Sequence, residues 1–188
     1  TEFLTKDGSE NTIAVQVTNK QPSSRWYSGS GIYRDVTLSY RDKVQVAENG
    51  NHITTPKLAE QKDGNVETQI QSKIKNTAKT LAKVFVEQQI FTKEGKAVSD
   101  LVRSVTKNLS GNETADFKQT ILVNKPTLWT TKSYHPQLYV LKTKVYNEGQ
   151  LVDVTEDTFG YRYFNWTAKD GFSLNGERMK FHGVSIHH

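Results

Sequence analysis

The stretch Val66-Glu67-Thr68-Gln69-Ile70-Gln71-Ser72-Lys73-Ile74-Lys75-Asn76 alternates between two kinds of side chain. Apolar or short side chains occupy every second position, and long polar or charged side chains occupy the positions between them. Successive residues of a β-strand face opposite sides of the sheet, so this pattern is typical of an antiparallel strand with one buried face. The stretch therefore predicts half-buried β-structure.

Similar segments continue along the chain. They are residues 81–91, 97–107, 113–123, 138–146 and 151–159. Turn-forming residues separate them, as in Thr92–Lys96, Ser110–Asn112 and Asn147–Gly149, and no convincing amphipathic helix occurs. Several short strands with such punctuation predict an all-β protein. We expect an immunoglobulin-like antiparallel β-sandwich over about residues 41–160, with flanking strands that belong to neighbouring domains.

The flanks carry strand signals of their own. Thr12–Val17 and Ile32–Tyr40 are predicted strands with too few partners to form a core, so they require a sheet supplied from elsewhere. Near the other end, Asn175-Gly176 predicts a tight hairpin, and Phe181–Ile186 is a further predicted strand. We therefore expect the chain to be a piece of a larger protein.

Composition excludes several classes of function. The chain of 188 residues has 10% aromatic residues, which argues against disorder, and no apolar run approaches the roughly 18 residues of a membrane span. The absence of cysteine removes disulfides, thiol nucleophiles and thiolate zinc sites. The net charge of +5 comes from 25 Lys and Arg scattered among 20 Asp and Glu, whereas a nucleic-acid surface needs clustered cations. We expect neither a nucleic-acid nor a membrane partner.

The densest basic segment is Lys73 to Lys83, where lysines mix with apolar residues. We interpret it as a solvated sheet face, which also discourages edge-to-edge aggregation.

Several co-linear motifs carry a resemblance to a known family. Arg25-Trp26-Tyr27-Ser28-Gly29-Ser30-Gly31-Ile32-Tyr33-Arg34 lies near the start, and Leu128-Trp129 and Pro136–Tyr139 lie further on. Phe172–Glu177, preceded by Phe159-Gly160-Tyr161-Arg162, leads to the terminal Gly183-Val184-Ser185-Ile186-His187. The order resembles that of the family 2 glycoside hydrolases, typified by bacterial β-galactosidase, β-glucuronidase and β-mannosidase.

The resemblance implies a division into three parts. In that family a jelly-roll sugar-binding domain precedes an immunoglobulin-like sandwich, which leads into a TIM barrel. Residues 1–40 would be the last strands of the jelly roll, 41–160 the sandwich, and 161–188 the entry hairpin and first strand of the barrel. Gln21–Gly31 looks most like the β-galactosidase branch of Gram-positive bacteria. The alternative parent activity is β-glucuronidase, and a location outside the cell or at its surface is an expectation.

The resemblance also implies where the chemistry lies. Retaining glycosidases use two carboxyl groups about 5 to 5.5 Å apart. In the family both are glutamates on later barrel strands, and no glutamate here matches them, so we expect no catalytic residue, no cofactor and no hydrolysis by this chain alone. The parent would act on a β-galactoside or a related glycan.

His187 matches a family histidine that lines the sugar subsite, and it is the one substrate-binding residue that the resemblance implies. The alternative is that His187 and His188 are a frayed end or a purification tag. A metal site formed by His182, His187 and His188 is not expected, because alternation places His187 and His188 on opposite faces of a strand.

The remaining conspicuous residues have structural interpretations. We expect Trp26 and Tyr27 to anchor a loop against a neighbouring domain, and Trp129 and Trp166 to lie in a core or an interface. Arg34 and Arg162 are expected to pair with carboxylates across domain boundaries. A competing hypothesis is a carbohydrate-binding or adhesive immunoglobulin-like module of a surface protein.

Overall fold

The computed structural model describes residues 4–5, 7–20, 29–132 and 136–186. The chain divides into two units, one formed by Thr1–Ser39 with Gly183–His188 and the other by Tyr40–His182. All the helices and strands of the described residues lie in the second unit. None of the helices in the described ranges is long and apolar enough to cross a membrane.

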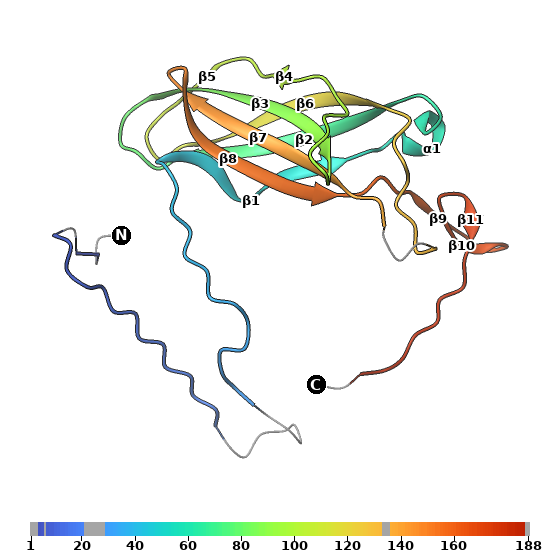
Figure 1. The fold of residues 1–188 in the computed structure, drawn as a ribbon, viewed down its shortest axis with the longest axis horizontal. Helices are drawn as coiled ribbons and strands as arrows, with labels where there is room; N and C mark the ends of the chain where they lie inside the picture. The colour runs from blue at the N-terminus through green and yellow to red at the C-terminus, as the bar shows by residue number, and fades with distance from the viewer. Residues whose placement is uncertain (1–3, 6, 21–28, 133–135, 187–188) are drawn as a thin grey trace. The chain divides into compact units, whose positions relative to one another are not determined.

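Two antiparallel sheets form the body of the second unit (Figure 1). One sheet contains β1 (Val44–Thr54), β2 (Asn65–Asn76) and β6 (Thr114–Asn124), in the order β1-β2-β6. The other contains β3 (Ala82–Thr92), β4 (Val102–Arg103), β5 (Lys107–Leu109), β7 (Tyr139–Asn147) and β8 (Gln150–Phe159). Its order is β4-β3-β7-β8, and β5 also pairs with β3. A single-turn helix, α1 (Leu58–Gln61), connects β1 to β2.

This strand order is that of an immunoglobulin-like sandwich. The short β4 and β5 can be counted together as the fourth strand of the chain. The first, second and fifth strands (β1, β2 and β6) then share one sheet, and the third, sixth and seventh (β3, β7 and β8) share the other. Strands A, B, E and strands C, F, G are divided in the same way in that fold. The predicted fold class is confirmed. A third, small sheet follows the sandwich and contains β9 (Phe164–Thr167), β10 (Gly171–Leu174) and β11 (Glu177–Arg178).

The alternation in β2 has the predicted structural meaning. Val66, Thr68, Ile70, Ser72 and Ile74 are all buried, whereas Lys73 and Lys75 are exposed. Lys79 and Lys83 are exposed as well, which agrees with the interpretation of the basic segment as a solvated face.

The predicted single strand over residues 97–107 is wrong. In place of one long strand, the structure has two short ones: β4 within this range, and β5, which begins at its last residue. Two serines explain the difference, because their hydroxyl oxygens accept hydrogen bonds from β3 where a backbone carbonyl would otherwise pair. Ser99 Oγ accepts from the Ile90 N–H at 3.0 Å, and Ser104 Oγ accepts from the Val86 N–H at 2.9 Å.

Strand β1 was not predicted from the sequence. Its pairing register with β2 shifts between Val46 and Asn51, which marks a β-bulge. Asn49 has φ 51°, and a Cβ on Gly50 would lie 2.7 Å from the Ala47 carbonyl oxygen. The bulge breaks the alternation that would reveal a strand.

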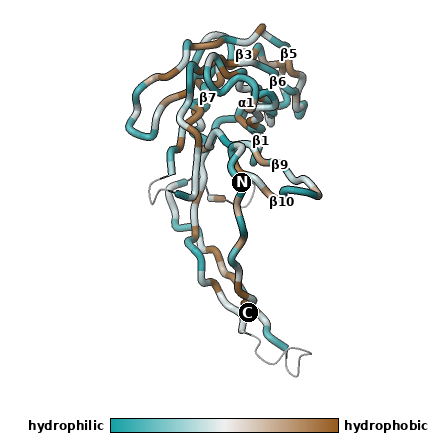
Figure 2. Tube along the Cα trace, turned by 90° about the vertical axis from the view of Figure 1, so that its right-hand side faces the viewer, coloured by the Kyte–Doolittle hydropathy of each residue, from teal (hydrophilic) through white to brown (hydrophobic). Residues whose placement is uncertain are grey.

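The flanking segments do not form the predicted strands. Thr12–Val17, Ile32–Tyr40 and Phe181–Ile186 have no strand pairing, and their apolar side chains are exposed, with Ile13 at 81%. Figure 2 shows apolar positions along the unpaired terminal segments as well as in the sandwich. A strand is defined by hydrogen bonds to a partner, and the described chain offers these segments none. Flanking strands do form in β9 to β11.

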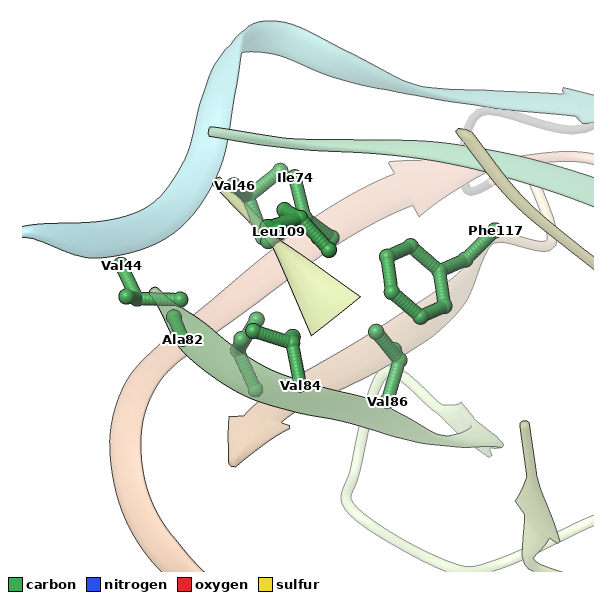
Figure 3. Packing of buried hydrophobic residues seen from close by; sticks show 9 residues of the cluster. Val44, Val46, Ile74, Ala82, Val84, Val86, Leu109 and Phe117 are labelled. Atoms are coloured by element: carbon green, nitrogen blue, oxygen red, sulfur yellow. The ribbon is translucent and has the colours of Figure 1, made fainter. Parts of the chain in front are cut away.

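Two apolar clusters fill the sandwich. The entry cluster lies where the chain enters β1, and Figure 3 shows most of its side chains converging between the sheets: Val44, Val46, Ile74, Ala82, Val84, Val86, Leu109, Phe117 and Val145. The exit cluster lies where the chain leaves for β9, and it consists of Leu58, Val66, Ile70, Ile90, Ile121, Val123, Tyr139, Leu141 and Tyr161. The two clusters therefore occupy opposite ends of the sandwich.

Candidate functional site: an aromatic face on the C-terminal hairpin

The small sheet is built around the Asn175-Gly176 turn. Leu174 pairs with Glu177 across it, and the two turn residues have φ 53° and 84°. Positive φ at both central residues is the requirement of a type I′ turn, which Asn-Gly meets at little cost. The predicted tight hairpin is confirmed.

The side chain of Asn175 fastens this hairpin to the sandwich. Its Nδ2 donates to the Trp129 carbonyl oxygen at 2.8 Å, and its Oδ1 accepts from the Tyr163 N–H at 3.2 Å. Main-chain bonds reinforce the joint, because the N–H of Asn175 donates to the Tyr163 carbonyl and that of Trp129 donates to the Tyr161 carbonyl, each at 2.8 Å. The hairpin is therefore attached through several directed hydrogen bonds.

Tyr161 anchors the base of the hairpin in the exit cluster. It is fully buried, and its hydroxyl shares a hydrogen bond of 2.8 Å with Thr68 Oγ1. Its ring meets Tyr139 and Phe159 edge-on, with centroids 5.0 and 5.2 Å away. Burial raises the pKa of the Tyr161 hydroxyl far above its ordinary value, so the group is neutral in the folded protein.

Trp129 packs closely against the same base. A Cβ on Gly160 would lie 3.1 Å from the Trp129 Cβ, so the absence of a side chain there gives the indole its place. The guanidinium of Arg162 lies over the indole, 4.7 Å from the ring centroid. Within the described residues Arg162 therefore contacts an aromatic ring, and its pairing with a carboxylate across a domain boundary stays a prediction.

The outer side of the hairpin carries an exposed aromatic face. Phe172 lies at its centre, with ring centroids 4.9 Å from Trp166, 4.6 Å from Phe181 and 6.4 Å from Phe164. Trp166 is 63% exposed, so it is not a core residue. Leu174 and Met179 join the aromatic rings in lining a groove, together with Trp129, Thr131 and Arg162. We call this surface the aromatic face.

The chemistry of the aromatic face is that of apolar contact. The described side chains that line it include no carboxylate, carboxamide or imidazole, and its polar groups are the hydroxyl of Thr131 and the guanidinium of Arg162. It offers no pair of groups for acid–base catalysis and no set of metal ligands. Nowhere in the described chain do three or more His, Asp or Glu side chains form a potential metal site.

The predicted substrate-binding residue, His187, lies outside the described residues, as do His188, Trp26 and Tyr27. His182 is described and exposed. The Arg34 guanidinium lies 5.4 Å from the centroid of the Tyr33 ring.

The sequence analysis missed two residues that hold the site together. The turn conformation of Asn175 was predicted. Its side-chain hydrogen bonds to residues 129 and 163 were not, because no sequence pattern around Asn175 indicates them. The sequence places Tyr161 in a motif but does not reveal that its side chain is buried. The spacing of Phe164 and Trp166, two residues apart, is a signal that could have revealed one apolar face of a strand.

The fold and site together define a class of protein, an immunoglobulin-like sandwich with a firmly attached apolar hairpin. Residues 50–162 match the glycosyl hydrolases family 2. The chain belongs to this family.

Individual relatives carry two kinds of name. The chain is 36% identical over 179 residues to the β-galactosidase BoGH2A of Bacteroides ovatus, covering 95% of this chain and 20% of that protein. It is 35% identical to a putative β-glucuronidase of Formosa agariphila, covering 95% of this chain and 16% of that protein. A crystal structure of a Bacteroides uniformis β-glucuronidase matches with a TM-score of 0.66 and 25% identity, over 78% of this chain and 18% of that one. The chain thus spans about a fifth of the length of these relatives.

Proposed function

We propose that the chain is a non-catalytic structural part of a family 2 glycosidase, which positions a sugar-binding domain against a catalytic barrel. In this proposal residues 1–40 are the last strands of the sugar-binding jelly roll, 41–160 are the sandwich, and 161–188 are the entry hairpin and first strand of the barrel. His187 would then lie at the sugar subsite of the whole enzyme. The observation that carries the proposal is the aromatic face, exposed on a hairpin that Asn175 attaches to the sandwich.

The composition of the aromatic face favours a protein partner over a sugar. A glycan site needs several polar groups to pair with hydroxyls, and the described lining provides only Thr131 and Arg162, the latter lying over Trp129. Its rings are tilted against one another by 31° to 54° rather than forming a flat platform. Exposed apolar surfaces of this kind are typical of contacts with another protein or domain.

The first candidate for the parent activity is a retaining β-galactosidase, and the second is a β-glucuronidase. Both names occur among the relatives at nearly equal identity, 36% and 35%. The complete protein, assayed with nitrophenyl β-D-galactoside and nitrophenyl β-D-glucuronide, decides between them by the ratio of kcat/KM. A strong preference for the glucuronide would replace the first candidate with the second.

The absence of catalysis by this chain is tested with the same two substrates. Purified chain is expected to give turnover no faster than a buffer blank, because no paired carboxyl groups are expected in it. Turnover that follows the protein through purification would refute the non-catalytic role.

The contact of the aromatic face is tested by Trp166→Ser in the complete protein. We expect a lower temperature of thermal inactivation and a lower kcat/KM, because a buried indole would be lost from the contact between domains. The matched control is Leu122→Ser, since Leu122 is a large, 53% exposed apolar residue on the sandwich. Equal effects of the two changes would contradict the proposal.

The competing hypothesis is a carbohydrate-binding or adhesive module, and a glycan array separates it from the structural role. We expect the purified chain to bind no glycan. Binding that Trp166→Ser abolishes and Leu122→Ser preserves would favour the module and identify the aromatic face as its site.

A further inference from the structure

Buried polar residues cross the core between the two apolar clusters. Each of four long strands contributes one of them, flanked two residues away on either side by a member of each cluster. They are Ser72 between Ile70 and Ile74, Gln88 between Val86 and Ile90, Gln119 between Phe117 and Ile121, and Thr143 between Leu141 and Val145. We call these four residues the polar belt. The belt lies at one level of the sandwich and spans both of its sheets.

Hydrogen bonds connect most of the belt across the sheets. Gln88 Nε2 on β3 donates to Ser72 Oγ at 2.9 Å and to Thr143 Oγ1 at 3.0 Å. Ser72 Oγ donates in turn to Asn51 Oδ1 at 2.5 Å, and Asn51 Nδ2 donates to Asp157 Oδ2 at 2.6 Å. The bulge in β1 directs Asn51 inward to this position. The network therefore runs from one sheet to the other and ends at the partly buried Asp157.

Three atoms of the belt do not share in this network. Gln88 Oε1 and both Gln119 Nε2 and Gln119 Oε1 are buried and have no hydrogen-bond partner in the described part of the chain. Gln88 is fully buried, and Gln119 is 8% exposed. Buried polar groups are almost always paired, with protein or with ordered water, because an unpaired one loses its hydration without replacement.

Water can form hydrogen bonds with all three unpaired atoms. They consist of two carbonyl oxygens, which accept, and one amide nitrogen, which donates, and water can both donate and accept. The strands that carry them, β3 and β6, contact each other across the sandwich. Buried waters occur where several otherwise unpaired polar groups converge.

We propose that the polar belt is a binding site for water, in which at least one ordered water molecule bridges the carboxamides of Gln88 and Gln119. The bridge completes a hydrogen-bonded layer that joins the two sheets midway between the clusters. It is independent of the glycosidase role proposed above. The arrangement that competes with it is a direct hydrogen bond between the two carboxamides after a rotation of one of them.

A double-mutant cycle tests whether the two carboxamides are linked. Gln88→Met, Gln119→Met and the double variant of the whole chain are compared by their equilibrium constants of unfolding in urea. A bridge predicts that the effect of the double change departs from the product of the single effects by about threefold or more. The matched control pairs Gln88→Met with Gln69→Met, because Gln69 is exposed on β2, and their effects should multiply. Multiplication in the Gln88 and Gln119 cycle overturns the proposal.

A second measurement on the unaltered chain distinguishes water from a direct contact and does not depend on the folding of any variant. Nuclear magnetic resonance should detect Overhauser and rotating-frame cross-peaks of opposite sign between the Gln119 amide protons and water, which is the sign pattern of a bound molecule rather than of proton exchange. The exposed Gln69 amide should lack them. Cross-peaks between the Gln88 and Gln119 side chains without any to water would establish the direct bond and overturn the proposal.

Discussion

Strand β2 and residues 12–17 carry the same alternation of side chains, but they have opposite structural outcomes. In β2 the apolar positions are buried, and Ile70 is 2% exposed between β1 and β6. In Thr12–Val17 the equivalent Ile13 is 81% exposed, and no strand pairs with the segment. Alternation thus predicts which face of a strand is apolar, whereas the presence of a partner decides whether that face is covered.

The largest expected effect separates these two regions directly. Ile70→Ala should lower the free energy of unfolding by about 3 kcal/mol, because it leaves a cavity in the exit cluster. The same change at the exposed Ile13 should alter it by less than about 0.5 kcal/mol. Urea unfolding of the two variants measures both values. Similar losses would show that residues 12–17 contribute to a core.

The hairpin provides an intermediate case, since its own strands are short and its attachment depends on one side chain. Asn175→Ala should cost the small sheet about 1 to 2 kcal/mol, because it removes the bonds to the Trp129 carbonyl and the Tyr163 N–H. Hydrogen exchange should accelerate in β9 and β10 and stay unchanged in β2. The control is Asn165→Ala, because within the described residues the Asn165 side chain accepts a hydrogen bond only from the N–H of its neighbour, Trp166. Faster exchange throughout the sandwich would contradict a local role.

A smaller effect is expected at the base of the hairpin. Tyr161→Phe keeps the ring packing and removes the hydroxyl that bonds Thr68, so it should cost about 1 kcal/mol. Thermal unfolding monitored by circular dichroism measures the loss. A drop as large as that of Ile70→Ala would mean that the ring itself had moved.

The smallest effect appears at alkaline pH. Burial raises the pKa of Tyr161 in the folded state above its ordinary value of 10.0. Below pH 10 the hydroxyl is neutral in both the folded and the unfolded protein, so its full contribution to stability is present there. As the pH rises past about 10, the unfolded chain releases this proton first and stability falls, by less than about 1 kcal/mol near pH 10.5. Urea unfolding between pH 8 and about 10.5 should show a shallower decline in Tyr161→Phe. Equal slopes in both proteins would remove Tyr161 as the cause.

Local chemistry was predictable from the sequence. The buried face of β2 follows from a period that every sheet imposes, and the Asn175-Gly176 hairpin follows from the ease with which these residues adopt positive φ. The immunoglobulin-like class followed from several such elements taken together. These features depend on neighbours in the sequence, so they are visible there.

Features that depend on distant residues were not predictable. The bulge before Asn51 concealed β1, and two serine hydroxyls replaced the expected strand after residue 97. Asn175 bonds a carbonyl 46 residues away, and Tyr161 bonds a hydroxyl 93 residues away. The aromatic face was only partly foreseen, in Trp129 and Trp166, and the role of His187 stays a prediction.

The pairing of β3 with Ser99 and Ser104 has a consequence for how the protein behaves at high concentration. On the edge of β3 that faces this loop, the backbone N–H groups of Val86 and Ile90 already donate to hydroxyl oxygens of the same chain. An incoming strand from another molecule would have to displace these bonds before it could add to the sheet. At these two positions the loop thus leaves no free N–H for an added strand, and removing both hydroxyls would make the two amides available again.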